Sequence, residues 1–389
     1  LETTVATLTA SAGAAANSGF GIFLTETYAV TIDTMTINVN RVTATATAPA
    51  TSNSAQEDLR TPNGGHVVLV SGNLTVNGGS DANGVIATGV GNVLLDVTGS
   101  VTLNASLDGG SGNMTVRASG AISQMAAGDI TTTAGTIDVE STGGTITMDD
   151  GAVAQTGGGS IRYKASGDIT VGMLDARTST NRTNGLLTGQ AASWGQVSIL
   201  SGASILDNAE TTVDVYAREL RINATTATGA ATNHLETETD KVSASSGANG
   251  LFMVEATAVT VGQTAAVTVQ RVGRDGATLT PTTDAIQNDF VSAGALVLQT
   301  TAGSITTLST GAISAAGNML VQAQGTSADI TLGAAVSNSS GNISLNAARD
   351  VLQNADVTAS GAAKTIDILA GRAVTIDRKS TRLNSSHVK

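Results

Sequence analysis

The stretch GNMTVRA, residues 112–118, decides the fold of this chain. It opens with a Gly-Asn turn and then alternates apolar and polar residues. Because successive side chains of a strand point to opposite faces, Met114, Val116 and Ala118 are expected on a buried face. The two residues between them are expected on the outer face. The stretch therefore predicts a short β-strand that is buried on one side.

The same pattern recurs along most of the chain. It is found as GNVLLDV (91–97), GNMLVQA (317–323) and GNISLNA (341–347), and with altered turns as GTIDVES (135–141), GSIRYKA (159–165) and KTIDILA (364–370). The first buried residues of these segments form a ladder, Val67, Val93, Met114, Ile137, Ile161 and Val197, then Leu296, Met319, Ile343 and Ile366. Most steps of the ladder are 21 to 26 residues long. Such a period indicates a solenoid.

Each step of the ladder also holds a second and a third short apolar segment, such as GTIT (144–147), GAVAQ (151–155) and GAISA (311–315). Three short strands in about 23 residues are the size of one coil of a parallel β-helix. We therefore predict an all-β protein, a right-handed parallel β-helix of roughly 16 coils and about 23 residues per coil. At about 4.8 Å per coil, the rod would be about 75 Å long.

A longer repeat encloses the coils. Leu1-Glu2-Thr3 reappears as Leu235-Glu236-Thr237, GIFLTETYAVTI (21–32) as GLFMVEATAVTV (250–261), and INVNRV (37–42) as VTVQRV (267–272). We read residues 1–376 as one continuous β-helix fragment with a repeat unit of about 229 residues. A first partial copy would cover 1–234 and a second 235–376.

Composition excludes several classes of function. The net charge of −12 argues against nucleic-acid binding, which requires clustered Lys and Arg. The chain has no cysteine, so disulfides and thiolate metal sites are excluded. No apolar run reaches the ~18 residues of a transmembrane helix, so direct membrane insertion is not expected. Because the chain starts at Leu1 and shows no signal peptide, we read it as a fragment of a longer exported protein.

The last thirteen residues, DRKSTRLNSSHVK (377–389), differ from the rest in composition. Four of the 19 basic residues fall within them. The string resembles a translated sequencing adapter. We interpret it as a non-native tail rather than as a basic arm for nucleic acid or membrane.

The repeated GN coils resemble the filamentous-haemagglutinin type of repeat found in very large bacterial adhesins and exoproteins. The segments 205–224 and 235–262 are similar to the long repeats of giant bacterial surface proteins. The resemblance implies an extracellular or outer-membrane-associated structural stalk acting in adhesion or biofilm matrix. It implies host or cell-surface glycans, proteins or matrix as partners, and no enzymatic activity or cofactor.

One cluster of charged residues is a candidate site. Asp138, Glu140, Arg162 and Lys164 are expected on the outer face of neighbouring coils. A catalytic or sugar-binding patch of a polysaccharide-degrading β-helix enzyme is one interpretation. Ordinary charge pairing between coils on a solvated face is the one we favour, so we assign no catalytic residue. Thr rows on the outer face leave ice binding as a lesser alternative.

The longest step of the ladder predicts a protruding loop at 176–195. Trp194, Arg182 and Asn184 of this loop are candidates for binding a partner. The alternative is that Trp194 simply packs onto the rod. Two further candidate loops are 228–241 and 272–289.

No metal site is predicted. His234 is followed by Glu236, Glu238 and Asp240, which could attract a cation, but a solvated acidic loop is favoured. GGSDANGV (78–85) has a faint similarity to calcium-binding nonapeptide repeats.

The predicted faces give further expectations. Val116→Asp should open the stack, whereas Thr115→Asp should be nearly silent. Asn92, Asn113, Asn318 and Asn342 should stack into hydrogen-bonded ladders, and the Gly before each should supply positive φ. Uncapped coils at the two ends should favour end-to-end self-association.

Overall fold

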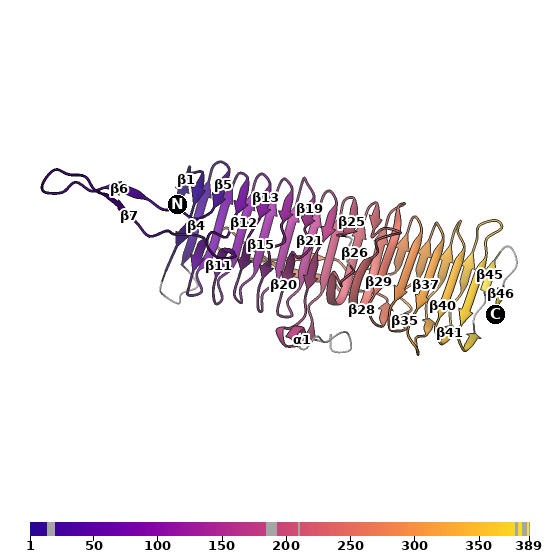
Figure 1. Cartoon of the computed structure of the whole chain (residues 1–389). Helices are drawn as coiled ribbons and strands as arrows, with labels where there is room; N and C mark the ends of the chain where they lie inside the picture. Colours follow the sequence, from indigo (N-terminus) through magenta and orange to yellow (C-terminus); the bar gives the residue numbers. More distant parts are fainter. Residues whose placement is uncertain (14–19, 184–192, 209–210, 378–379, 383–386, 389) are drawn as a thin grey trace.

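The chain folds as a parallel β-solenoid of about 16 turns with about 23 residues per turn, which confirms the predicted fold (Figure 1). We describe it from a computed structural model. The described residues are 1–13, 20–183, 193–208, 211–377, 380–382 and 387–388. Helix accounts for only 2% of the chain.

In the N-terminal half, each turn contributes three strands that stack in register into three columns, which we call the N-terminal stack. The first column contains β4 (Gly21–Glu26), β9 (His66–Ser71), β12 (Val93–Val97), β15 (Met114–Ala118), β18 (Ile137–Ser141), β21 (Ile161–Ala165) and β24 (Val197–Ser201). The second contains β5 (Val30–Ile32), β10 (Leu74–Val76), β13 (Val101–Leu103), β16 (Ile122–Gln124), β19 (Ile146–Met148), β22 (Ile169–Val171), β25 (Ser204–Asp207) and β27 (Ala227–Thr228). The third contains β8 (Leu59–Thr61), β11 (Asn83–Ala87), β14 (Ser106–Asp108), β17 (Ile130–Thr131), β20 (Val153–Gln155) and β23 (Met173–Asp175).

The C-terminal half repeats this arrangement as the C-terminal stack. Its first column contains β29 (Gly250–Glu255), β34 (Leu296–Thr300), β37 (Met319–Ala323), β40 (Ile343–Ala347), β43 (Ile366–Ala370) and β46 (His387–Val388). Its second contains β30 (Val259–Val261), β35 (Ile305–Thr307), β38 (Ile330–Leu332), β41 (Asp350–Gln353) and β44 (Ala373–Ile376). Its third contains β33 (Phe290–Ser292), β36 (Ile313–Ala315), β39 (Val336–Asn338), β42 (Val357–Ala359) and β45 (Ser380–Arg382).

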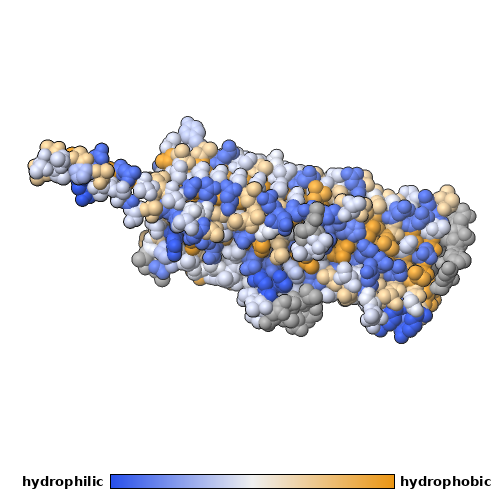
Figure 2. Space-filling view, in the orientation of Figure 1, coloured by the Kyte–Doolittle hydropathy of each residue, from blue (hydrophilic) through white to orange (hydrophobic). Residues whose placement is uncertain are grey.

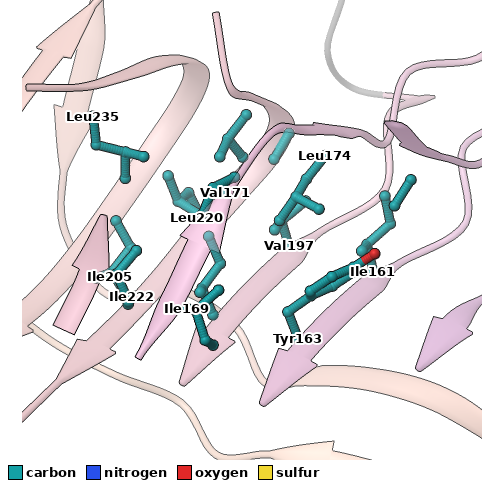
Figure 3. Packing of buried hydrophobic residues seen from close by; sticks show 14 of the residues in the cluster. Ile161, Tyr163, Ile169, Val171, Leu174, Val197, Ile205, Leu220, Ile222 and Leu235 are labelled. Atoms are coloured by element: carbon teal, nitrogen blue, oxygen red, sulfur yellow. The ribbon is translucent and has the colours of Figure 1, made fainter. Parts of the chain in front are cut away.

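The predicted ladder of inward residues forms the core. Met114 pairs with Val93 on one side and Ile137 on the other, and all three are fully buried. Figure 3 shows such residues pointing into the interior from successive strands, with Tyr163 the one large aromatic side chain among those labelled. Each buried aliphatic side chain contributes roughly 1.5–3 kcal/mol. The solenoid is therefore held by many thin apolar layers.

The asparagine ladder is confirmed at both predicted pairs. The backbone N–H of Asn113 donates to Asn92 Oδ1 at 2.8 Å, and that of Asn342 donates to Asn318 Oδ1 at 3.0 Å. The expected role of the preceding glycine is wrong, because Gly112 is not among the residues with positive φ. A Cβ there would lie 1.9 Å from the carbonyl oxygen of Gly91. Glycine is needed because the turns of successive coils nearly touch.

The two stacks meet at two long strands, β26 (Val215–Ala224) and β28 (Leu235–Ser246), which pair along most of their length. The residues at 235–241 therefore form a strand, and the loop predicted there is wrong. The beginning of β28 pairs with β29, whereas its later residues pair with β30 and β33. The second and third columns of the C-terminal stack thus lie over the first column of the N-terminal stack. At this joint, the columns of the C-terminal stack are therefore offset around the solenoid axis from those of the N-terminal stack.

The first three strands of the chain pair with their neighbours as β28 pairs with β29, β30 and β33. β1 (Glu2–Thr3) pairs with β4, β2 (Thr7–Leu8) with β5, and β3 (Ala10–Ser11) with β8. Thr3 donates to the carboxylate of Glu26 at 2.8 Å, as Thr237 does to that of Glu255 at 2.7 Å. The similar sequences therefore form similar structures.

Among the described residues, two antiparallel hairpins lie outside the stacks. β6 (Asn38–Asn40) pairs with β7 (Ala50–Ser52), and β31 (Val267–Val272) pairs with β32 (Leu279–Asp284). Each hairpin leaves the solenoid between a second-column strand and a third-column strand. The prediction of a loop over 272–289 is wrong in part, because the second strand of this hairpin, β32, lies within it. Figure 1 shows β6 and β7 standing clear of the N-terminal end of the rod.

The helix α1 (Ser179–Thr183) lies in the protruding segment between β23 and β24. None of the described residues belongs to a helix with the length and hydrophobicity of a membrane-spanning segment.

Candidate functional site

The hairpin β31–β32 lies on the outer face of the first column of the N-terminal stack. We call the outer surface of β9, β12, β15, β18 and β21 the clasped face. The N–H of Gln270 donates to Thr136 Oγ1 at 2.8 Å, and that of Val272 donates to Thr115 Oγ1 at 3.0 Å. The hairpin reaches this face because the offset at the joint places β30 and β33, between which it emerges, above the same column.

Apolar contacts hold the tip of the hairpin. Val272 packs against Val68 and Leu94 of the clasped face, and each of the three is at most 3% exposed. Val267 and Val269 are also fully buried. At roughly 1.5–3 kcal/mol for a fully buried aliphatic side chain, these contacts stabilise docking substantially.

Charged side chains bridge the hairpin and the rod. Asp138 is fully buried and accepts from Arg162 Nη1 at 2.9 Å and from Arg271 Nε at 2.7 Å. Arg162 Nε also donates to both carboxylate oxygens of Asp284 at 3.1 Å. Arg162 on the rod and Arg271 on the hairpin thus share one carboxylate.

Glu140 completes the network. Its carboxylate accepts from Arg271 and lies 3.4 Å from Lys164 Nζ. Burial alone would raise the pKa of Glu140, but attraction from Arg271 and Arg162 holds the pKa below its ordinary value. Among the described residues, the three acids Asp138, Glu140 and Asp284 pair here with four bases, namely Arg162, Arg271, Lys164 and Arg117. Each carboxylate of the network therefore has a cationic partner, as a buried charge requires.

This arrangement corrects the interpretation of the charged patch as a solvated surface. Asp138, Glu140, Arg162 and Lys164 do lie outward on neighbouring coils and do pair across them. Asp138, Glu140 and Arg162 are nevertheless buried beneath the hairpin, and only Lys164 stays exposed. The carboxylates are therefore closed to a polysaccharide chain.

Thr115 is corrected for the same reason. It was expected on a solvated face, but it is fully buried and accepts the backbone N–H of Val272. A negative charge at Thr115 would lie under the hairpin, so Thr115→Asp cannot be silent.

The protruding segment 176–195 does not display its tryptophan. Trp194 is 2% exposed and contacts Tyr216 edge-to-face, with ring centroids 6.5 Å apart. The guanidinium of Arg177 lies 3.5 Å above the same Tyr216 ring. The packing alternative thus describes Trp194, while Asn184 lies outside the described residues.

Arg182 anchors α1 to the rod. Its Nε donates to Asp175 Oδ2 at 2.8 Å, and its Nη2 donates to the carbonyl oxygen of Thr156 at 2.6 Å. Burial would raise the pKa of Asp175, but hydrogen bonds from Arg177 and Arg182 hold the pKa below its ordinary value. The guanidinium of Arg182 is therefore engaged by the rod itself.

The acidic residues after His234 do not converge on its ring. His234 stacks on Phe252 with centroids 5.9 Å apart, and burial lowers its pKa. Glu238 is buried and accepts from Thr257 Oγ1 at 2.8 Å. Glu236 instead lies near Asp207 and Asp214, each offering a ligand atom within 4.8 Å of the others.

A second group of three carboxylates was not expected in full from the sequence. Asp81 of the GGSDANGV segment meets Glu57 and Asp58, again with one oxygen each within 4.8 Å. Burial raises the pKa of Asp58 to about 6, and repulsion from Asp81 and Glu57 adds to the effect. Ser80 already donates to both oxygens of Glu57, so the geometry alone assigns no cation here.

Comparisons of the chain with known protein families, with curated proteins and with solved structures find no match.

Proposed function

We propose that this chain is a structural and adhesive stalk segment of a large secreted or cell-surface bacterial protein. The observation that carries the proposal is the use of a cluster of outward charges, Asp138, Glu140 and Arg162, to bind the chain's own hairpin. These charged side chains stabilise the rod and are not available to a substrate. The filamentous-haemagglutinin resemblance of the coils points in the same direction.

The rod architecture suits a spacer. In a solenoid each turn contacts only its neighbours, so stability is a sum of local terms. The hairpin adds contacts that connect several turns to one another, because it binds both Arg162 on β21 and Asp96 on β12. Such a clasp resists the opening of single turns under load.

The polysaccharide-degrading alternative requires free carboxylates. Glycoside hydrolysis needs two of them flanking an open groove at a spacing of roughly 5–9.5 Å. Asp138 and Glu140 are instead sealed and neutralised by Arg162 and Arg271. The proposal is therefore a non-enzymatic protein acting outside the cell in adhesion or biofilm contacts, with glycans, proteins or matrix as partners.

The test combines binding with turnover. The purified chain is immobilised and assayed for retention of glycans and cells, and separately for release of reducing ends from polysaccharides. Retention without turnover is expected. Reducing-end release that is lost in a folded Arg162→Gln variant, but kept in the exposed control Lys164→Gln, would replace the stalk by an enzyme.

A further inference from the structure

The two hairpins have similar sequences but opposite surroundings. Three apolar residues of the first hairpin are exposed to solvent, and the residues at the equivalent places in the second are buried. They are Ile37 (53%), Val39 (51%) and Val42 (72%), against Val267 (0%), Val269 (0%) and Val272 (3%). Figure 2 shows the first hairpin projecting beyond the body, with apolar residues along it. An apolar stripe that the chain buries in one copy is thus left open in the other.

The surface that receives the second hairpin is also present twice. We call the outer surface of β34, β37, β40 and β43 the open face. On the clasped face one residue of each successive strand contacts the hairpin, and the open face carries a similar row in the same register. The rows are Val68, Leu94, Thr115 and Asp138, and Val297, Leu320, Ser344 and Asp367. The first row is buried, whereas the second is partly or fully exposed.

The charges of the free hairpin and of the open face are complementary. Arg271, which binds Asp138, has its counterpart in Arg41, and Asp138 has its counterpart in Asp367. The Arg274–Asp96 ion pair of the docked hairpin has no counterpart on either side. Ala44 and Gln322 stand at those positions, so neither partner is left with an unpaired charge.

We propose that the hairpin 37–53 of one chain docks on the open face of a second copy of this chain, in the register of the internal clasp. Val42 then lies against Val297 and Leu320, its N–H donates to Ser344, and Arg41 pairs with Asp367. This inference is independent of the adhesive role proposed above.

The position of the two surfaces fixes the symmetry of the assembly. The free hairpin extends from the N-terminal end of the rod, and the open face belongs to the C-terminal stack (Figure 1). The contact joins two different surfaces, so it is heterologous and leaves one of each unused. Association is therefore head-to-tail and open-ended.

Sedimentation velocity of the full chain, from micromolar to several hundred micromolar, tests the proposal. The wild-type chain should form a concentration-dependent series of head-to-tail oligomers. Arg41→Glu and Asp367→Arg should each weaken association at least tenfold, because like charges then face each other. Mixing the two variants should restore association, since each then meets a complementary partner.

Two control variants carry a new charge elsewhere. Ser52→Asp lies on the second strand of the same hairpin, at the place where Thr283 of the docked hairpin stays exposed, and Thr331→Asp lies on the second column of the C-terminal stack. Both should associate like the wild type, and all variants should share its melting temperature at low concentration. A chain that stays monomeric throughout, or oligomers that Arg41→Glu leaves unchanged, would overturn the proposal.

Discussion

Replacing Val272 by Asp tests whether the hairpin β31–β32 is fastened to the rod. Val272 is 3% exposed and lies between Val68 and Leu94. The substitution removes an apolar contact worth roughly 1.5–3 kcal/mol and places a carboxylate without a cationic partner among aliphatic groups. Together these effects should make docking of the hairpin less favourable by about 3–5 kcal/mol. The hairpin would then detach before the stack unfolds.

The chain provides its own control for this change. Val42 occupies the equivalent place in the first hairpin but is 72% exposed, so Val42→Asp in dilute solution should change stability by less than about 0.5 kcal/mol. Limited proteolysis in segment 273–279 and unfolding in urea are the two readouts. Val272→Asp should be cut much faster than Val42→Asp and the wild type. Equal cleavage and equal unfolding midpoints for the two variants would refute the docked hairpin.

Further predictions follow from the same contrast between covered and open positions. Thr115→Asp should lower the free energy of unfolding by about 2–4 kcal/mol, because Thr115 is buried under Val272. Ser344→Asp at the equivalent place on the open face should leave the free energy of unfolding nearly unchanged. Urea titrations of both variants check this, and equal losses of stability would contradict the register. Burial raises the pKa of Glu255 well above its ordinary value of 4.5, and repulsion from Glu238 adds to it, so the native chain keeps a proton that the unfolded chain releases. Stability should therefore fall as the pH rises from about 4.5 through that raised pKa, and Glu255→Gln should flatten this decline in melting curves recorded from pH 4 to 8.

The stacked part of the fold could be predicted from the sequence because its rule is local and repeated. An inward residue such as Met114 recurs at a nearly constant spacing, and a slip of one residue would turn every apolar side chain outward. The ladder from Val67 to Ile366 and the asparagine pairs follow from that rule alone. The reason predicted for Gly112, a positive φ, was nevertheless wrong. Glycine is required there by the close approach of successive coils, which the sequence of a single coil does not show.

The hairpin and the joint could not be predicted from the same rule. VTVQRV alternates like any strand of the stack, so periodicity alone places it there. The signal that distinguishes it is the Asp275-Gly276 turn between two alternating segments, which is typical of a hairpin. The first part of β28, residues 235–241, was predicted as a loop, and its buried residues Thr237 and Thr239 are polar. Their hydroxyls donate to the carboxylate of Glu255 on the next coil, a contact that the alternation within one strand does not show.

The candidate site shows the limit of reasoning from one strand at a time. Asp138, Glu140, Arg162 and Lys164 were correctly placed on one outward surface. The burial of Asp138, Glu140 and Arg162 depends on Arg271 and Asp284, which belong to a segment more than 100 residues away in sequence. Apolar residues at outward positions, such as Val68 and Leu94, were the available evidence that something covers this face.

Hydrogen exchange of the two hairpins in one sample tests the central claim most directly. In dilute solution the amides of 267–272 and 279–284 should be protected, and those of 38–40 and 50–52 should exchange rapidly, because an isolated two-stranded hairpin is marginally stable. At high concentration the first hairpin should become protected as it docks on a second chain. Similar rapid exchange of both hairpins in dilute solution would contradict the clasp, and with it the structural role assigned to the charges beneath it.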